Sequence, residues 1–128
     1  MDYVADTHSL VWYFTNDSRL SDNALQAFQS SVNEGTIFIP AVVLAEIMYI
    51  ADKGRIILSF EETLRKIDET DNFAITPLDT EILKIAFQNG TELEMHDRLI
   101  LATALFHNSP LITKDEVLRS LNTVPTVW

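Results

Sequence analysis

The amino-acid sequence alternates between short apolar runs and longer segments whose apolar residues have helical spacing. The short runs predict strands at residues 2–5, 36–39, 73–76 and 110–113. The longer segments predict helices at residues 9–14, 22–33, 41–52, 60–69, 80–90, 97–107 and 116–121. Such alternation predicts an α/β fold with a small, doubly wound, mostly parallel sheet of four to five strands flanked by helices. Sheets of this kind bind ligands beyond the carboxyl ends of their strands.

Residue types at several predicted boundaries support these helices. Ser21 and Asp79 have side chains that commonly cap the first turn of a helix, and Ser59 and Glu62 have the spacing of a capping box. The stretch 124–128 carries no clear pattern, and no element is assigned to it.

The composition predicts one soluble domain over residues 1–128. The chain has 47% hydrophobic residues, three Gly and four Pro, so it can form a sizeable core and shows no linker. The absence of cysteine excludes a disulfide framework and a thiolate metal site. There is no basic leader and no run of about 18 apolar residues, which predicts a cytoplasmic protein without a membrane segment.

The net charge of the chain does not by itself favour binding to nucleic acid, so the prediction of function depends on where individual acids lie. The net charge is −10, from 19 acids and 9 bases, and this sign opposes general attraction to phosphate backbones. Most of the acids fit a solvated surface. Four of them, however, are predicted at one edge of the sheet: Asp6 and Asp115 follow strands, Glu46 lies two turns into a helix that begins at a strand end, and Asp97 begins a helix. We therefore expect four carboxylates from distant segments to meet in one cleft.

Each of these acids also has a purely structural explanation. Asp6, Asp97 and Asp115 could cap helices. Glu46 could be protonated or reach solvent, although a lone carboxylate within the apolar segment VVLAEIMYI is costly. Together, four acids at one edge would repel one another unless a cation lies between them.

A divalent cation would resolve this repulsion. Carboxylate oxygens suit Mg²⁺ or Mn²⁺, and such sites catalyse the hydrolysis of phosphodiester bonds. The bases nearest to the acids in sequence are Arg98 and Lys114, which we expect to bind substrate phosphates. The composition and spacing thus predict a metal-dependent nuclease.

Four segments of the sequence also resemble the motifs of a known family. The segments DTHSLVWYF, LAEI, HDRLILATAL and LITKDEV, in this order and over almost the whole chain, resemble the motifs of PIN-domain ribonucleases. The greatest likeness is to the VapC-type toxins of prokaryotic toxin–antitoxin pairs. This resemblance implies a Mg²⁺- or Mn²⁺-dependent endoribonuclease that acts on RNA, forms a homodimer and is neutralised by a cognate antitoxin.

The resemblance also implies roles for individual residues. Asp6, Glu46 and Asp97 match the metal-binding core, and Asp115 matches the fourth acid, which supports a second metal or the attacking water. Thr113 matches a threonine whose hydroxyl orients the site. The chain departs from the pattern in two places. Val43 stands where relatives often have Ser or Thr, and Glu116, beside Asp115, could take over the role of the fourth acid.

Two other functions are compatible with parts of the sequence. An aspartyl-phosphate protein of the phosphatase or receiver type would use Asp6 as a nucleophile, but Thr7 and His8 stand where such a phosphatase needs a second Asp. A degenerate PIN-like module that only binds RNA or protein is the non-enzymatic alternative. Weaker candidates are three histidines, two aromatic residues for base stacking and two residues for an interface: His8, His96, His107, Trp12, Tyr13, Met48 and Tyr49.

Overall fold

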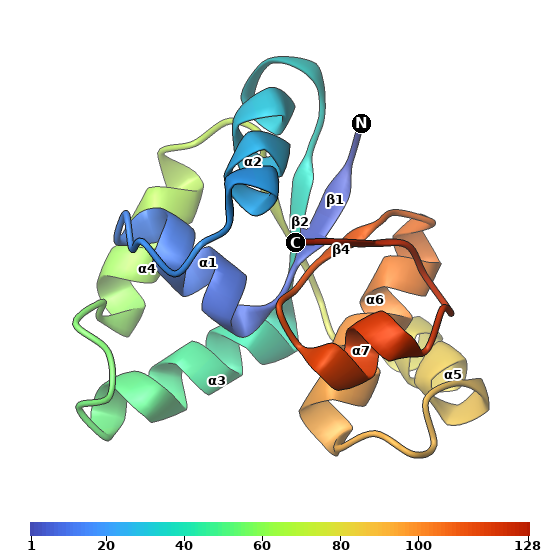
Figure 1. Ribbon diagram of the computed structural model, residues 1–128. Coiled ribbons are helices and arrows are strands. Elements are labelled where there is room, and N and C mark those ends of the chain that lie inside the picture. Colours follow the sequence, from blue (N-terminus) through green and yellow to red (C-terminus); the bar gives the residue numbers. More distant parts are fainter.

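The computed structural model describes residues 1–128 and contains a five-stranded, fully parallel sheet with helices packed around it (Figure 1). The strand order is β3-β2-β1-β4-β5, so the first strand occupies the centre. The strands are β1 (Tyr3–Ala5), β2 (Ile37–Pro40), β3 (Phe73–Thr76), β4 (Leu111–Ile112) and β5 (Thr126–Val127). The helices are α1 (Thr7–Phe14), α2 (Asp22–Glu34), α3 (Ala41–Asp52), α4 (Phe60–Asp68), α5 (Thr80–Gln88), α6 (Met95–His107) and α7 (Glu116–Ser120).

The central strands are apolar because both of their faces are covered. Val4 and Ala5 of β1 and both residues of β4 have no exposed surface, as is usual for parallel strands between two layers of helices. Figure 1 shows α1, α2 and α4 on one side of the strands and α5, α6 and α7 on the other. Helix α3 lies below the carboxyl ends of the strands and packs against both α1 and α6. The predicted α/β sheet with flanking helices is confirmed.

The predicted caps are also present. The side chain of Ser21 accepts a hydrogen bond from the backbone of Ala24, and that of Asp79 accepts one from Ile82. The Ser59 hydroxyl accepts one from the backbone of Glu62, whose carboxylate accepts one in return. The bonds to Ser21, Asp79 and Ser59 each satisfy an otherwise unpaired first-turn N–H group, so these caps account for the helix starts that the sequence indicates.

Four elements differ from the prediction by two residues or more. Helix α1 begins at Thr7 and not at Ser9, and helix α5 ends at Gln88 and not at Gly90. Strand β5 was missed because it has only two residues; it is held by bonds from the backbone of Leu111 to Pro125 and from Thr113 to Val127. Helix α6 begins at Met95 and not at Asp97. The sequence pattern did not reveal this earlier start, because the first turn is polar or exposed and precedes the apolar stretch. None of the helices has the length and apolar composition needed to cross a membrane.

Candidate active site

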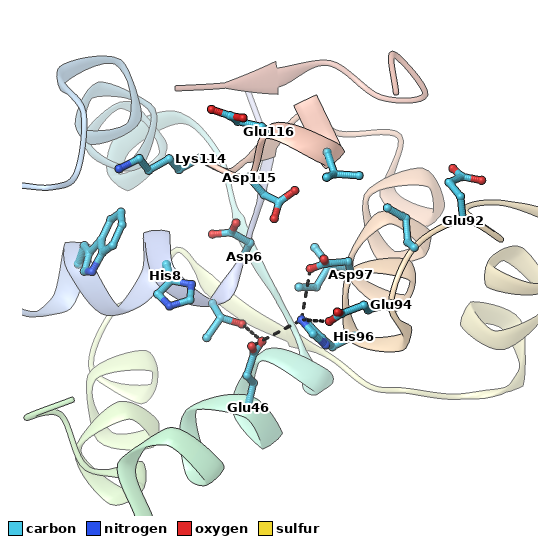
Figure 2. A pocket seen from close by; sticks show the side chains of 15 residues that line it. Asp6, His8, Glu46, Glu92, Glu94, His96, Asp97, Lys114, Asp115 and Glu116 are labelled. Carbon is cyan, nitrogen blue, oxygen red and sulfur yellow. Dashed lines mark hydrogen bonds and ion pairs between the residues drawn. The ribbon is translucent and has the colours of Figure 1, made fainter. Parts of the chain in front are cut away.

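A cavity of about 670 Å³ lies beyond the carboxyl ends of the central strands. Strands β1, β2 and β4 are adjacent in the sheet, so the segments that follow them begin side by side. The cavity is lined by acids from all of the predicted segments, as Figure 2 shows: Asp6, Glu46, Glu92, Glu94, Asp97, Asp115 and Glu116. The structure therefore brings together the four acids that the sequence analysis singled out.

Asp6 is the most buried of these acids, with 8% of its surface exposed. It caps α1, because its Oδ1 accepts a hydrogen bond of 3.0 Å from the backbone N–H of Ser9. Its Oδ2 accepts one of 2.5 Å from the hydroxyl of Thr113. Burial raises the pKa of Asp6, and the hydrogen bonds from Thr113 and Ser9 only partly oppose this. The capping role and a place in the cavity are thus combined in one side chain.

Thr113 connects two of the acids. It is fully buried, and its hydroxyl donates to Asp6 and accepts a hydrogen bond of 3.0 Å from the backbone N–H of Asp115. Asp115 in turn caps α7, with its Oδ1 accepting from the backbone of Leu118 at 2.9 Å. In Figure 2 the Asp115 side chain points towards Asp6, whereas the side chain of Glu116 points away from it. This geometry favours Asp115 over Glu116 as the fourth acid.

Glu46 reaches the cavity from the second turn of α3. Its side chain is 24% exposed and lies outside the apolar core, which α3 contacts through Val43, Leu44 and Ile47. Its Oε1 accepts a hydrogen bond from the hydroxyl of Thr7. Thr7 was not among the residues predicted for the site. Its position directly after Asp6, at the start of α1, could have indicated that its side chain lies near the same edge of the sheet.

His96 and Asp97 enter the cavity from the first turn of α6. The His96 Nε2 atom lies 3.6 Å from Asp97 Oδ1, 3.7 Å from Glu46 Oε2 and 3.9 Å from Glu94 Oε2 (Figure 2). Burial raises the pKa of Asp97; nearby His96 lowers it, and the charges of the other three candidate acids raise it further. Asp97 makes no capping hydrogen bond, since the N-cap residue is Glu94. The capping explanation for Asp97 is therefore wrong.

These side chains fit a hard divalent cation in their chemistry. All four candidate ligands offer carboxylate oxygens, which Mg²⁺ and Mn²⁺ prefer, and a cation would offset the burial and repulsion that raise the pKa values of Asp6 and Asp97. In the structure no three acids or histidines form a group that could hold an ion.

Comparisons with known proteins identify the family of this chain. The PIN domain matches residues 3–123 of the chain. The chain belongs to the PIN-domain family. Within that family it is a homologue of ribonuclease VapC: ribonuclease VapC22 of Mycobacterium tuberculosis is 31% identical over 122 residues, which cover 91% of this chain and 89% of that protein. This membership sets aside the aspartyl-phosphate alternative.

Several solved structures show the same fold. The VapBC2 complex of Rickettsia felis, bound to a promoter DNA fragment, matches with a TM-score of 0.72 and 20% identity, over 98% of this chain and 97% of that chain. A toxin–antitoxin complex from Klebsiella pneumoniae matches with a TM-score of 0.66 and 22% identity, over 94% and 92%. FitAcB from Neisseria gonorrhoeae matches with 0.64 and 19%, over 97% and 95%.

The two predicted substrate-binding bases of this PIN domain lie in different places. Lys114 lines the cavity. Arg98 does not: its Nε atom donates to the carbonyl oxygens of Ala86 and Asn89, and its Nη2 atom donates to that of Phe87. These bonds tie the end of α5 to α6, so the structure gives Arg98 a structural contact and leaves Lys114 as the base beside the acids.

The weaker candidates lie in three different parts of the structure. His8 and Trp12 line the cavity beside the acids. Tyr13 stacks on Phe28 in the core, with 4.3 Å between ring centroids, and is not placed to stack on a base. The ring of His107 stacks on that of Phe38, and its Nε2 atom forms a hydrogen bond with the hydroxyl of Thr76. His107 does not line the cavity. The predicted interface residues of α3 are exposed, namely Met48 and Tyr49.

Proposed function

We propose that this PIN domain is an endoribonuclease that hydrolyses RNA phosphodiester bonds with Mg²⁺ or Mn²⁺ held by Asp6, Glu46, Asp97 and Asp115. The observation that carries the proposal is the convergence of these four carboxylates, from four separate segments, on one cavity. Such a cluster of acids repels the phosphates of a substrate unless a bound cation neutralises it. Membership of the PIN-domain family and the similarity to a VapC ribonuclease support the same chemistry.

The bound metal would activate a water molecule and stabilise the charge that develops on the leaving oxygen. The chain supplies the positioning. Ser9 and Thr113 hold the carboxylate of Asp6 in one orientation, and Thr7 holds that of Glu46. Such supporting hydrogen bonds keep ligands in place before the substrate arrives. Asp115 keeps one oxygen on α7, and its side chain points into the cavity, where it would orient the attacking water.

The chain would act as the toxin of a toxin–antitoxin pair. Several solved relatives are complexes of toxin and antitoxin. The acidic cavity and the net charge of −10 suit an antitoxin segment rich in Lys or Arg, because opposite charges steer association and determine which partner fits. We propose further that the protein is a homodimer, as the family resemblance implies.

The first experiment measures cleavage of a mixture of single-stranded and structured RNAs with Mg²⁺, with Mn²⁺ and with chelator. We expect metal-dependent cleavage by the wild type and none by the Asp6→Asn, Asp97→Asn double variant. Asp68→Asn is the matched control, because it makes the same change on an exposed residue of α4. If the folded wild type cuts no RNA under any metal condition, the domain is a binding module and the proposed function is wrong.

A further inference from the structure

The bases of the cavity lie on one side of it. Of the nine Lys and Arg residues of the chain, Lys114 is the only one that lines it. Figure 2 shows Lys114 and His8 on the α1 side, with Glu116 above Lys114, and Glu92 and Glu94 on the opposite side. An RNA strand carries a negative charge at every phosphate, so the α1 side is the one that attracts it and the opposite side repels it.

Lys114 is also free to bind an anion. Its ammonium group forms no ion pair with a carboxylate, even though Asp115 and Glu116 follow it directly in the chain. It lies instead over the ring of Trp12, 5.7 Å from the ring centroid. A lysine over the face of an indole is attracted to it, and this contact draws the ammonium group towards α1 and away from the neighbouring acids.

Trp12 is well suited to hold the lysine in place. It is only 9% exposed, and its ring is contacted by the rings of His8 at 5.6 Å and Trp128 at 5.9 Å and by the guanidinium of Arg19 at 4.9 Å. Because the ring is buried among these groups, little of its face remains for a nucleobase. Trp12 is therefore a support for Lys114 and not a stacking platform.

We infer that the RNA strand passes along the α1 side of the cavity, with Lys114, positioned by Trp12, binding a phosphate next to the one that is cut. This inference rests on the proposed ribonuclease function. Contact with a phosphate reads no base, so Lys114 sets the position and direction of the strand but not its sequence. Glu92 and Glu94 exclude the strand from the other side of the cavity.

The test measures RNA binding by proteins that do not cut. In an Asp97→Asn background, binding of a short fluorescein-labelled single-stranded RNA of mixed sequence is followed by anisotropy over a series of KCl concentrations. Lys114→Gln should weaken binding about tenfold at low salt, as expected for the loss of one charged contact. It should also reduce the slope of log affinity against log salt concentration by about 0.7, the value for one phosphate of a single strand.

Lys53→Gln is the matched control. This substitution removes the same charge from a lysine that also lies beside an aromatic ring, since the Nζ atom of Lys53 is 5.5 Å from the ring centroid of Tyr49. Lys53 does not line the cavity. The substitution should leave the slope unchanged. If Lys53→Gln and Lys114→Gln change the slope equally, or if neither changes it, the inference is wrong. Absence of binding by the Asp97→Asn protein at every salt concentration also overturns it.

The positioning role of Trp12 needs a separate variant. In the protein that keeps Lys114, Trp12→Leu should reduce the slope of log affinity against log salt concentration. In the protein that carries Lys114→Gln, Trp12→Leu should leave this slope unchanged. If Trp12 had a purely structural role, its replacement would not alter the slope in either protein. Circular dichroism establishes whether Trp12→Leu folds; if it does not, the comparison of Lys114→Gln with Lys53→Gln decides alone. Failure of wild-type cleavage refutes the nuclease, while an unchanged slope in a protein whose wild type cuts RNA refutes only the strand path.

Discussion

Asp97 is predicted to destabilise the metal-free protein. Its pKa is raised by burial and by the charges of Asp6, Glu46 and Asp115, and His96 opposes this. A carboxyl whose folded pKa is raised contributes stability below its unfolded pKa of about 3.9 and loses it as the pH rises through the folded pKa. At neutral pH the ionised group therefore opposes folding.

Asp97→Asn removes this charge at little other cost. The Asp97 side chain caps no helix and accepts no hydrogen bond, so its isosteric replacement breaks only the ion pair with His96. The charge that opposes folding is lost with the substitution, and the partial exposure of the group keeps the effect small, so we expect Asp97→Asn to be modestly more stable than the wild type. In a domain of this size each kcal/mol of stabilisation raises the melting temperature by about 4 °C.

The assay is thermal denaturation with chelator and with Mg²⁺, at about pH 8, where imidazole is ordinarily neutral. With chelator, Asp97→Asn should melt above the wild type. With Mg²⁺ at about ten times its dissociation constant, the wild type should gain about 1.4 kcal/mol and the variant much less. The exposed control Asp68→Asn should follow the wild type in both. The reasoning fails if Asp97→Asn melts below the wild type in chelator, or if both gain equally from Mg²⁺.

Three further predictions concern single contacts. Thr113→Val leaves the buried Asp6 carboxylate without one of its two donors and should cost about 2 kcal/mol in urea denaturation and most of the cleavage rate; unchanged cleavage would contradict the orienting role. Burial lowers the pKa of His107, so the stability that its neutral form contributes above about pH 6.5 is lost as the pH falls, and His107→Gln should lose less between pH 7.5 and 5.5; equal losses would show that His107 is not responsible. Arg98→Lys should cost about 1 kcal/mol because it loses its bonds to three carbonyls, yet keep RNA affinity; weaker RNA binding in the folded variant would return Arg98 to the substrate.

The sequence was sufficient for β1 to β4 and for the convergence of the acids. The bounds of α3 are read correctly because its apolar run follows Pro40, which suits a helix start, and ends just before Gly54. The place of an acid after a parallel strand also determines the sheet edge at which it lies, which is why Asp6 and Asp115 could be placed together. Strand β5 could not be predicted, because two half-buried residues carry no period.

Side-chain direction was the harder part. Arg98 follows Asp97 directly in the chain, but successive helix residues point about a quarter-turn apart, so Arg98 reaches the end of α5 and not the cavity. Thr7 was overlooked for the opposite reason: a short polar residue at a helix start has many ordinary roles, and only the position of Glu46 in space shows which one it has. Sequence adjacency therefore predicted membership of the cavity for Lys114 but failed for Arg98.

Asp6 and Asp115 each hold the first turn of a helix with one oxygen while facing the cavity. Asparagine caps a helix about as well as aspartate. An aspartate-to-asparagine exchange at either position would therefore remove one of the proposed metal ligands and leave the start of the helix intact, whereas alanine would remove both. A single substitution would thus give an inactive protein with the same surface as the active one. Such a protein would still bind any partner whose contacts depend on the fold and not on catalysis.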